Sequence, residues 1–178
     1  VDNLGKRYGS RWLFRNLSFE VEQGQVLLIR GRNGSGKSTL LKCLVGLIEP
    51  TSGEVNRPVE VGYYGLDSSA YAELTGKEHL EMLGTNDVGQ FEQIGLGQAM
   101  NQKVGEYSSG MRGRLKLLVA QVNNPPLLLL DEPTAALDAT GQGLVEELVR
   151  AQQSRGAVVI ATNSELDAQW GTHELTLE

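Results

Sequence analysis

A glycine-rich stretch between an apolar run and a helix-forming segment constrains this chain more than any other feature. It reads Gly31-Arg32-Asn33-Gly34-Ser35-Gly36-Lys37-Ser38-Thr39, which is a glycine, four spacers and then Gly-Lys-Ser. Glycines allow backbone angles that a Cβ would forbid, so several N–H groups can surround one anion. The run at 25–29 predicts a strand, and the segment 38–47 predicts a helix whose amino end favours negative charge. The stretch is therefore predicted to bind phosphate groups.

The polar side chains of this loop have predicted roles along a phosphate chain. Lys37 is expected to neutralise the β- and γ-phosphates, and Ser38 to offer its hydroxyl to Mg²⁺. The neighbouring residues expected to contact the same ligand are Asn33, Gly34, Ser35, Gly36 and Thr39. A glycine-rich turn that merely precedes a lysine is the alternative, and the flanking strand and helix patterns argue against it.

Two acidic residues directly follow a second apolar run. Residues 127–130 are all leucine, as a parallel strand buried on both faces should be, and Asp131 and Glu132 come next. Side chains at the carboxyl end of such a strand lie at the crevice where ligands bind. Asp131 is therefore expected to hold Mg²⁺ and Glu132 to polarise an attacking water, as phosphoryl transfer requires. A helix-capping acid without chemistry is the alternative.

Strand-like and helix-like patterns alternate along the chain. The expected strands are 26–29, 59–64, 127–130, 158–161 and an edge strand at 174–178, and the expected helices are 38–47, 109–123 and 144–153. In the helix at 109–123, one face is expected to carry Leu115, Leu118, Val119 and Val122. Residues 19–24 predict a hairpin-like entry into the first of these strands. The alternation predicts an α/β fold with a mainly parallel sheet covered by helices on both faces.

One stretch has a different character. Residues 68–107 are expected to form a small helical insertion in a single domain, whose core comprises about 1–67 and 108–178 of the 178 residues. Thr75 and Glu78 within the insertion have the spacing of a helix capping box. The insertion therefore interrupts the α/β pattern without requiring a second domain.

Composition restricts what the chain binds and where it works. The formal net charge of −6 argues against a broad nucleic-acid surface, so no nucleic-acid partner is expected. Cys43 is the single cysteine, so no internal disulfide can form, and its apolar neighbours predict that it packs in the core. The longest apolar runs are too short to span a bilayer, so the chain itself is expected to be soluble.

Three further strings resemble motifs of the ATP-binding-cassette (ABC) ATPases. Residues 130–138, Leu-Asp-Glu-Pro-Thr-Ala-Ala-Leu-Asp, look like the Walker B motif and D-loop of that family. Residues 107–111, Tyr-Ser-Ser-Gly-Met, resemble its signature motif, usually Leu-Ser-Gly-Gly-Gln, and residues 50–54 are similar to a common family turn. The motifs occur in the family's order and approximate spacing, and the resemblance covers essentially the whole chain.

The resemblance implies a P-loop NTPase fold, ATP and Mg²⁺ as ligands, and a head-to-tail dimer. Each ATP would lie between the P-loop of one subunit and the signature motif of the other. Ser108 and Gly110 would then contact the γ-phosphate in trans, and the helix that begins near Ser109 would direct its dipole at it. Asp138 would lie at the dimer seam, and Tyr8 would stack on the adenine ring. Whether the partner is a second copy or a different cassette stays open.

Two positions depart from the family pattern. Where the family usually has a glutamine that helps to bind Mg²⁺, this chain offers Asp67, which could still act as a metal ligand. Where the family usually has a histidine, it has Asn163, which donates hydrogen bonds but cannot carry a proton. The signature motif is also altered at Ser109 and Met111. ATP hydrolysis, with Glu132, Lys37 and Asn163 as its catalytic residues, is therefore expected to be slow or stimulated by a partner.

The leading hypothesis is the ATPase subunit of an ABC transporter. It would be cytoplasmic and peripheral at the inner face of the membrane, held by a separate integral-membrane subunit that contacts the insertion and residues 67–73. The chain looks most like the haem-export ATP-binding subunit of cytochrome c biogenesis. Two alternatives stay open: a non-transport ATPase of a soluble assembly, and a weakly active regulatory cassette in a heterodimer, which Asp67 and Asn163 motivate.

Overall fold

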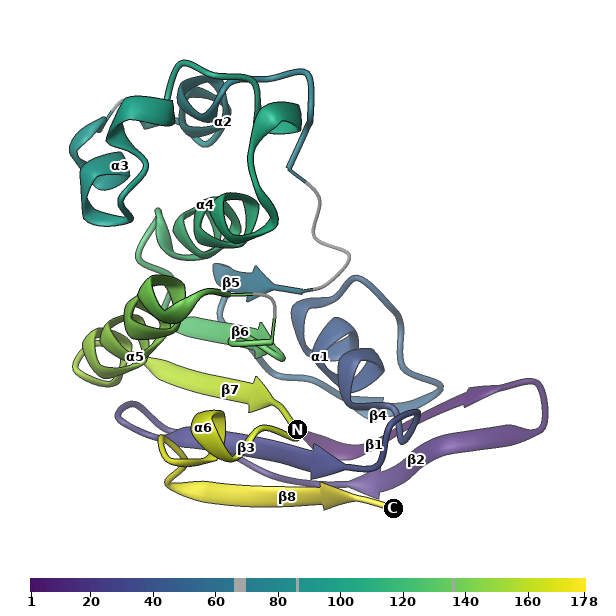
Figure 1. The fold of residues 1–178 in the computed structure, drawn as a ribbon. Helices are drawn as coiled ribbons and strands as arrows, with labels where there is room; N and C mark the ends of the chain where they lie inside the picture. The colour runs from purple at the N-terminus through teal and green to yellow at the C-terminus, as the bar shows by residue number, and fades with distance from the viewer. Residues whose placement is uncertain (66–69, 86, 136) are drawn as a thin grey trace.

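The alternation of strands and helices predicted from the sequence is present in the computed structural model, which describes residues 1–65, 70–85, 87–135 and 137–178 (Figure 1). Its strands are β1 (Asp2–Tyr8), β2 (Arg11–Leu17), β3 (Val26–Gly31), β4 (Ser52–Glu54), β5 (Val61–Tyr64), β6 (Leu127–Asp131), β7 (Ala157–Ala161) and β8 (His173–Leu177). Its α-helices are α1 (Lys37–Val45), α2 (Gly76–Met82), α3 (Gly89–Gln93), α4 (Ser109–Gln121), α5 (Ala139–Gln153) and α6 (Glu165–Ala168). Two single-turn 3₁₀ helices are η1 (Gly97–Ala99) and η2 (Val104–Glu106).

A five-stranded sheet forms the centre of the molecule in the order β5-β6-β7-β3-β8, and every neighbouring pair in it is parallel. Strands β6 and β7 are buried along almost their whole length, as their uninterrupted apolar sequences predict. Strand β8 is an edge strand, which confirms the expectation for the carboxyl-terminal residues. Because all five strands run the same way, the segments that follow them start from one edge of the sheet.

Successive residues of the central strands point to opposite faces of this sheet, and helices cover both faces. Leu128, Leu130 and Ile160 pack with α4 and α5 in one apolar cluster. Leu129 and Val159 pack with α1 in the other cluster, where the buried Cys43 also lies. Figure 1 shows α5 and α1 on opposite sides of the strands. The predicted α/β architecture is therefore confirmed.

A second, antiparallel sheet has the order β2-β1-β4. The hairpin expected at residues 19–24 is wrong: strands β1 and β2 form the hairpin instead, and residues 18–25 form no strand. Phe19 pairs with Val1, since each backbone nitrogen donates to the other's carbonyl at 3.2 and 3.0 Å. Those backbone groups are therefore not available for a ladder with β3, and Gly24 turns the chain with a φ of 86°.

The helical insertion lies beyond α4, away from the parallel sheet (Figure 1). It has its own apolar cluster around Leu80, Phe91 and Val104. All four residues expected on one face of the helix at 109–123 contribute to this cluster: Leu115, Leu118, Val119 and Val122. The opposite face of α4 buries Leu117 and Ala120 against the sheet cluster. Helix α4 thus connects the insertion to the core with two apolar faces.

Helix α5 begins five residues before its expected start at 144, because Asp138 caps it. The Asp138 carboxylate accepts a hydrogen bond from the Gly141 nitrogen at 2.8 Å. A carboxylate at this position satisfies a backbone donor that has no partner within the helix and complements the helix dipole. The periodicity of the apolar residues did not reveal this polar first turn.

We expect Thr75→Ala to lower the free energy of unfolding by about 1 kcal/mol, because it removes the cap of α2. Thr75 Oγ1 accepts from the Glu78 nitrogen at 3.2 Å, and the Thr75 nitrogen donates to Glu78 Oε2 at 2.7 Å, so the predicted capping box is confirmed. Chemical denaturation of the variant measures the loss. Thr75→Ser keeps the hydroxyl and is the matched control; an equal loss in both variants would contradict the capping role.

Candidate nucleotide-binding site

The glycine-rich loop connects β3 to α1 at the carboxyl edge of the parallel sheet. Its turn depends on Gly31, Gly34 and Gly36, whose φ angles of 150°, 83° and 101° are rarely adopted by residues with a Cβ. A Cβ on Gly36 would also lie 3.2 Å from atoms of Leu13 and Phe14 on β2. The antiparallel sheet therefore packs directly against the loop, and glycine is the residue that fits there.

Lys37, the first residue of α1, has its side chain folded back into the loop. It is 7% exposed, and its Nζ donates to the Gly31 carbonyl at 2.8 Å. One end of the Asn163 amide also lies 3.0 Å from Nζ. The ammonium is thus held by the two ends of neighbouring strands β3 and β7.

The contacts of Asn163 define the orientation of its amide. One end of the amide lies 3.0 Å from Lys37 Nζ and 3.0 Å from the Asn33 side chain, and the other end lies 2.8 Å from the Gly31 carbonyl. A lysine only donates and a carbonyl only accepts, so the amide oxygen faces Lys37 and its nitrogen faces Gly31. Asn163 therefore bridges the loop and the end of β7.

Glu132 begins the segment that follows β6 and adopts a left-handed backbone conformation, with a φ of 47°. Its nitrogen donates to the Ala161 carbonyl at 2.8 Å, which continues the β6–β7 ladder by one residue. Its Oε2 lies 3.1 Å from Thr162 Oγ1 and 3.4 Å from the Asn163 nitrogen. Asp131, the last residue of β6, is buried, with 2% of its surface exposed.

The structure brings together most of the predicted phosphate and metal residues. Ser38 and Thr39 occupy the first turn of α1, directly after Lys37. The Ser35 hydroxyl is buried and has no hydrogen-bond partner among the described residues, so it has a free capacity for a ligand. The proposed metal residue Asp67 lies outside the described residues.

Tyr8 lies at the end of β1, where it pairs with Arg11 at the tip of the hairpin. The residue is 55% exposed, and Lys6 Nζ lies 5.2 Å from the centre of its ring. An exposed ring with a cation on it offers a flat, polarisable face to a planar ligand. Its predicted contact with adenine stays a prediction.

The signature-like residues lie on a different element from the loop. Ser108 caps α4 by accepting from the Met111 nitrogen at 3.2 Å, and Ser109 and Gly110 form its first turn. A Cβ on Gly110 would lie 3.4 Å from Asp138 Oδ2, so the start of α4 faces the D-loop of the same chain. Helix α4 contacts the edge strand β5, whereas the loop follows β3 on the far side of β6 and β7.

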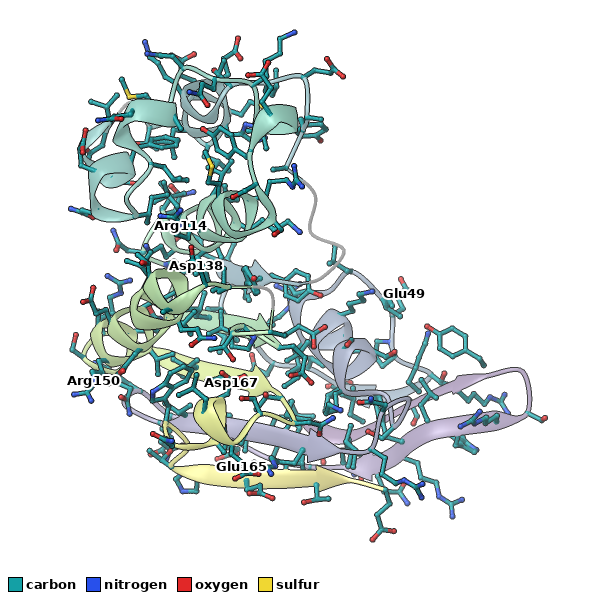
Figure 2. All side chains as sticks on the ribbon, viewed as in Figure 1. Glu49, Arg114, Asp138, Arg150, Glu165 and Asp167 are labelled. Atoms are coloured by element: carbon teal, nitrogen blue, oxygen red, sulfur yellow. The ribbon has the colours of Figure 1, made fainter. Side chains whose placement is uncertain are left out.

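A group that sequence reasoning missed lies behind Glu132. This group is Asp167 on α6 (Figure 2). It is fully buried and accepts hydrogen bonds from Thr134 Oγ1 at 2.8 Å and Thr162 Oγ1 at 2.6 Å. Asp167 stands in the run Ser164-Glu165-Leu166-Asp167, two residues after a second acid. The neighbouring Glu165 does face outward and pairs with Arg30 at 2.6 Å. No local pattern distinguishes the two acids, so only the fold could reveal the buried one.

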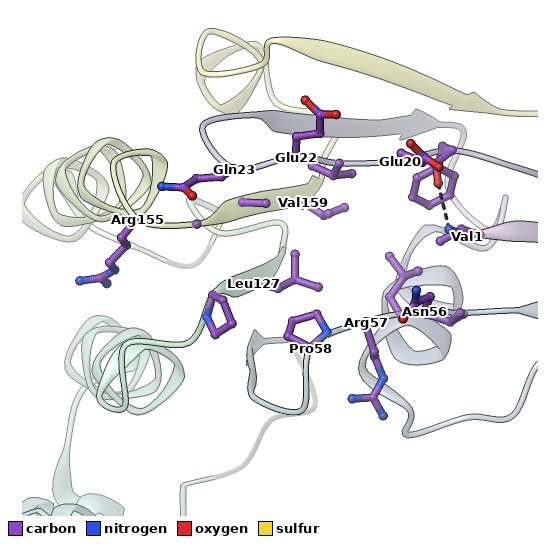
Figure 3. Close-up of a pocket in the computed structure, with 17 residues that line it drawn as sticks. Val1, Glu20, Glu22, Gln23, Asn56, Arg57, Pro58, Leu127, Arg155 and Val159 are labelled. Atoms are coloured by element: carbon purple, nitrogen blue, oxygen red, sulfur yellow. Dashed lines mark hydrogen bonds between the residues drawn. The ribbon is translucent and has the colours of Figure 1, made fainter.

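The molecule also has a cavity of about 490 Å³ at the opposite edge of the parallel sheet (Figure 3). Leu127 and Ala157, the first residues of β6 and β7, line it together with Val1 and Phe19. The carboxyl ends of these strands, which carry the phosphate-binding loop and Glu132, lie at the other end of the sheet. This cavity is therefore separate from the candidate site.

The parallel sheet and its glycine-rich loop define a P-loop nucleoside-triphosphate-binding domain. The family model of the ABC transporters matches residues 14–135, and the chain belongs to that family. It is 33% identical to the uncharacterized ABC transporter ATP-binding protein YxlF of Bacillus subtilis, over 95% of this chain and 63% of that protein. It is 34% identical to the cytochrome c biogenesis ATP-binding export protein CcmA of Agrobacterium fabrum, over 90% of this chain and 86% of that protein. The lantibiotic transport ATP-binding protein SrtF of Streptococcus pyogenes is 30% identical over 92% of this chain and 78% of its own length.

Solved structures show the same fold. An ATP-binding subunit of an ABC transporter superimposes with a TM-score of 0.91 at 23% identity, covering 100% of this chain and 85% of its own. An ATP-binding cassette in a dimeric post-hydrolysis state, bound to ADP and Pi, superimposes with a TM-score of 0.86 at 24% identity, covering 99% and 93%. The predicted P-loop NTPase fold and membership of the ABC ATPases are therefore confirmed. Within the described ranges, no helix is both long enough and apolar enough to cross a membrane.

We expect Asp167→Asn to change the pH dependence of stability. Burial raises the pKa of the Asp167 carboxyl above its ordinary value of 3.8, against the two threonine hydrogen bonds, which lower it. A group whose pKa is higher in the folded chain than in the unfolded chain stabilises the fold most at pH values below its unfolded pKa. This contribution to the free energy of unfolding is lost as the pH rises through the higher pKa of the folded chain. The Tm of the variant minus that of the unaltered chain should therefore increase from about pH 4 towards neutral pH. Thermal unfolding across this range measures it; a constant difference would contradict a raised pKa.

Proposed function

We propose that this chain binds and hydrolyses ATP as the ATPase subunit of an ABC transporter. The observation that carries the proposal is the convergence of Lys37, Asn163 and the Gly31 carbonyl within 3.0 Å, with Glu132 on the adjacent strand end. A buried ammonium in a glycine loop at the amino end of a helix is suited to a chain of phosphates. A carboxylate beside it is suited to polarising water for attack on the terminal phosphate.

The residues present fit the roles expected of them. Lys37 would exchange its contact with a carbonyl for contacts with the β- and γ-phosphates, and Ser35 has a free hydroxyl within the loop. Ser38 and Asp131 would hold Mg²⁺ together with the nucleotide, since hydroxyl, carboxylate and phosphate oxygens are the ligands that it prefers. Bound there, Mg²⁺ neutralises phosphate charge. Glu132 would orient the attacking water, and the Asn163 amide would donate to the γ-phosphate.

The proposal includes a head-to-tail dimer, because one chain holds the two halves of the site apart. Helix α4, which begins with Ser109 and Gly110 after its cap Ser108, contacts the edge strand β5, whereas the loop follows β3 on the far side of β6 and β7. A second cassette would supply the start of α4 in trans. The dimeric cassette of the same fold supports the arrangement by analogy.

We also propose that a separate integral-membrane subunit binds the helical insertion, described at 70–85 and 87–107, and the segment 67–73. Tyr71 and Met82, 59% and 61% exposed, offer apolar surface there. The likeness to CcmA supports haem export for cytochrome c assembly as the process served. The cassette would then be peripheral at the cytoplasmic face of the membrane.

A regulatory cassette in a heterodimer is the second candidate function, and Asn163 favours it. An amide cannot take up a proton, so the site has less scope for acid–base chemistry than one with a histidine there. Such a cassette would bind ATP and rely on the site of its partner for most of the turnover.

Glu132→Gln is expected to keep ATP binding and to lower kcat by at least about 100-fold, because the amide cannot polarise water as a carboxylate does. Phosphate release by the purified chain with Mg-ATP measures kcat, and a fluorescent ATP analogue measures binding. Lys37→Ala is the contrasting variant and should lose binding itself. Unchanged phosphate release in Glu132→Gln would refute the assignment of Glu132.

Specific ATPase activity is expected to rise with protein concentration, because two chains must meet to complete each site. Asn163→His, measured alongside, separates the two candidate functions. Activity in the unaltered chain that increases with concentration supports a working homodimer. Activity that stays near zero in the unaltered chain and is present in Asn163→His would instead favour the regulatory cassette.

A further inference from the structure

We infer that Asp167 is a positioning residue that acts on Glu132 through the hydroxyl of Thr162. The inference rests on the proposed function, in which Glu132 orients the attacking water. It assigns a role to a fully buried carboxyl that none of the motifs includes. Asp167 is not a catalytic residue, because the hydroxyl of Thr162 lies between it and Glu132.

A single carboxyl joins the two segments that carry the proposed catalytic side chains. Thr134 lies two residues after Glu132 and donates to Asp167 Oδ1 at 2.8 Å. Thr162 directly precedes Asn163 and donates to Asp167 Oδ2 at 2.6 Å. The segments after β6 and β7 are therefore tied together from behind, at a point shielded from solvent.

The Thr162 hydroxyl stands between two acids. Its Oγ1 lies 2.6 Å from Asp167 Oδ2 and 3.1 Å from Glu132 Oε2, and it accepts from the Ser164 nitrogen at 2.9 Å. A hydroxyl has one proton to donate, so it serves only one of the two carboxylates at a time. When Asp167 is protonated it donates to Thr162, and Thr162 is then free to donate to Glu132. The complete chain of bonds runs from Asp167 through Thr162 to Glu132 and holds the Glu132 side chain in place.

The surroundings of Asp167 raise the pKa of its carboxyl, although the bonds from Thr162 and Thr134 lower it, so its protonated form persists to a higher pH than that of a free aspartic acid. Burial is the main cause that raises the pKa of its carboxyl, and the negative charge of Glu132 from the neighbouring segment raises it further. Tyr64 on β5 also faces it; burial raises the pKa of that phenol, and the charge of Asp167 adds to the increase. Glu165, on the same helix, faces away and pairs with Arg30.

A purely structural role is the competing explanation. A buried carboxyl carries a desolvation cost that an apolar side chain of similar volume avoids. The two hydroxyl bonds offset this cost, and a structural role needs nothing more of them. The positioning role differs in one respect: the bond to Thr162 should matter for turnover, whereas the bond to Thr134 should matter only for stability.

Thr162→Val and Thr134→Val test this difference as a matched pair. Each replaces a buried hydroxyl with a methyl group and removes one bond to Asp167, but only Thr162→Val also removes the link to Glu132 and the acceptor of the Ser164 nitrogen. We expect Thr162→Val to lower kcat about tenfold with little change in the KM for ATP, and Thr134→Val to lower it less than about twofold. Thr162→Val should also lose more Tm than Thr134→Val, because it leaves the Ser164 nitrogen without its side-chain acceptor, and Thr162→Ser should restore kcat. Equal kcat values in the two valine variants overturn the inference.

Asp167→Asn provides a second test that does not depend on the valine variants folding. Its amide accepts from Thr134 and donates permanently to Thr162, as the protonated carboxyl does. The ratio of its kcat to that of the unaltered chain should therefore rise as the pH increases from acid to neutral, and a constant ratio overturns the inference. Glu165→Gln, on the same helix, is the control and should leave kcat unchanged.

Glu132→Gln in the same assay distinguishes a failure of the proposed role of Glu132 from a failure of the positioning role of Asp167. If it retains phosphate release, both the assignment of Glu132 and the positioning role of Asp167 fail. If it loses phosphate release while Thr162→Val and Thr134→Val behave alike, only the positioning role fails. If it loses phosphate release and Thr162→Val alone is impaired, both are supported.

Discussion

The parallel pairing of β3, β7 and β6 is the constraint on which the site depends. Parallel strands end at the same edge of a sheet, so three segments far apart in sequence begin side by side there. Two backbone hydrogen bonds extend the ladders past the strands: the Glu132 nitrogen donates to Ala161 at 2.8 Å, and the Thr162 nitrogen donates to Ile29 at 3.1 Å. The backbone of the sheet alone therefore determines where the glycine-rich loop, Glu132 and Asn163 begin.

The charge balance at this edge explains why the loop can accept an anion. Among the buried residues that the structure describes, Lys37 is the one lysine or arginine. Its partners are a carbonyl and an amide oxygen, which are neutral dipoles. A lysine paired with a carboxylate would have to break an ion pair to receive a phosphate, whereas Lys37 exchanges weaker contacts for stronger ones. A bound phosphate would therefore interact with the Lys37 ammonium without first breaking an ion pair, and burial has already removed most of the water from that ammonium.

The sequence predicted the elements whose signal is local. The phosphate-binding loop, the apolar strands, the capping box of α2 and the apolar face of α4 each depend on residues within one segment. The hairpin at 19–24 was predicted wrongly because Phe19 pairs with Val1, 18 residues away, and this pairing, which exists only in the fold, keeps its backbone groups from pairing with β3. The early start of α5 depends on a polar cap that apolar periodicity does not include. Asp167 was missed because Glu165 and Asp167 have the same local context, and only in the folded chain does Glu165 face outward while Asp167 bonds to Thr134 and Thr162 in the interior.

The asparagine at position 163, where the family usually has a histidine, makes the buried carboxyl of Asp167 relevant to the chemistry of the site. The family resemblance leads one to expect a histidine at this position, and a histidine would offer both a hydrogen bond to phosphate and a titratable group beside Glu132. Asn163 can supply the hydrogen bond but not the titration. Asp167 is a titratable group that reaches Glu132 through the hydroxyl of Thr162, out of contact with solvent. In such a site Asn163 supplies the hydrogen bond to phosphate and Asp167 supplies the titratable group, two properties that a histidine would combine. Asn163→His would therefore add a second titratable group to the site and would not replace a missing one.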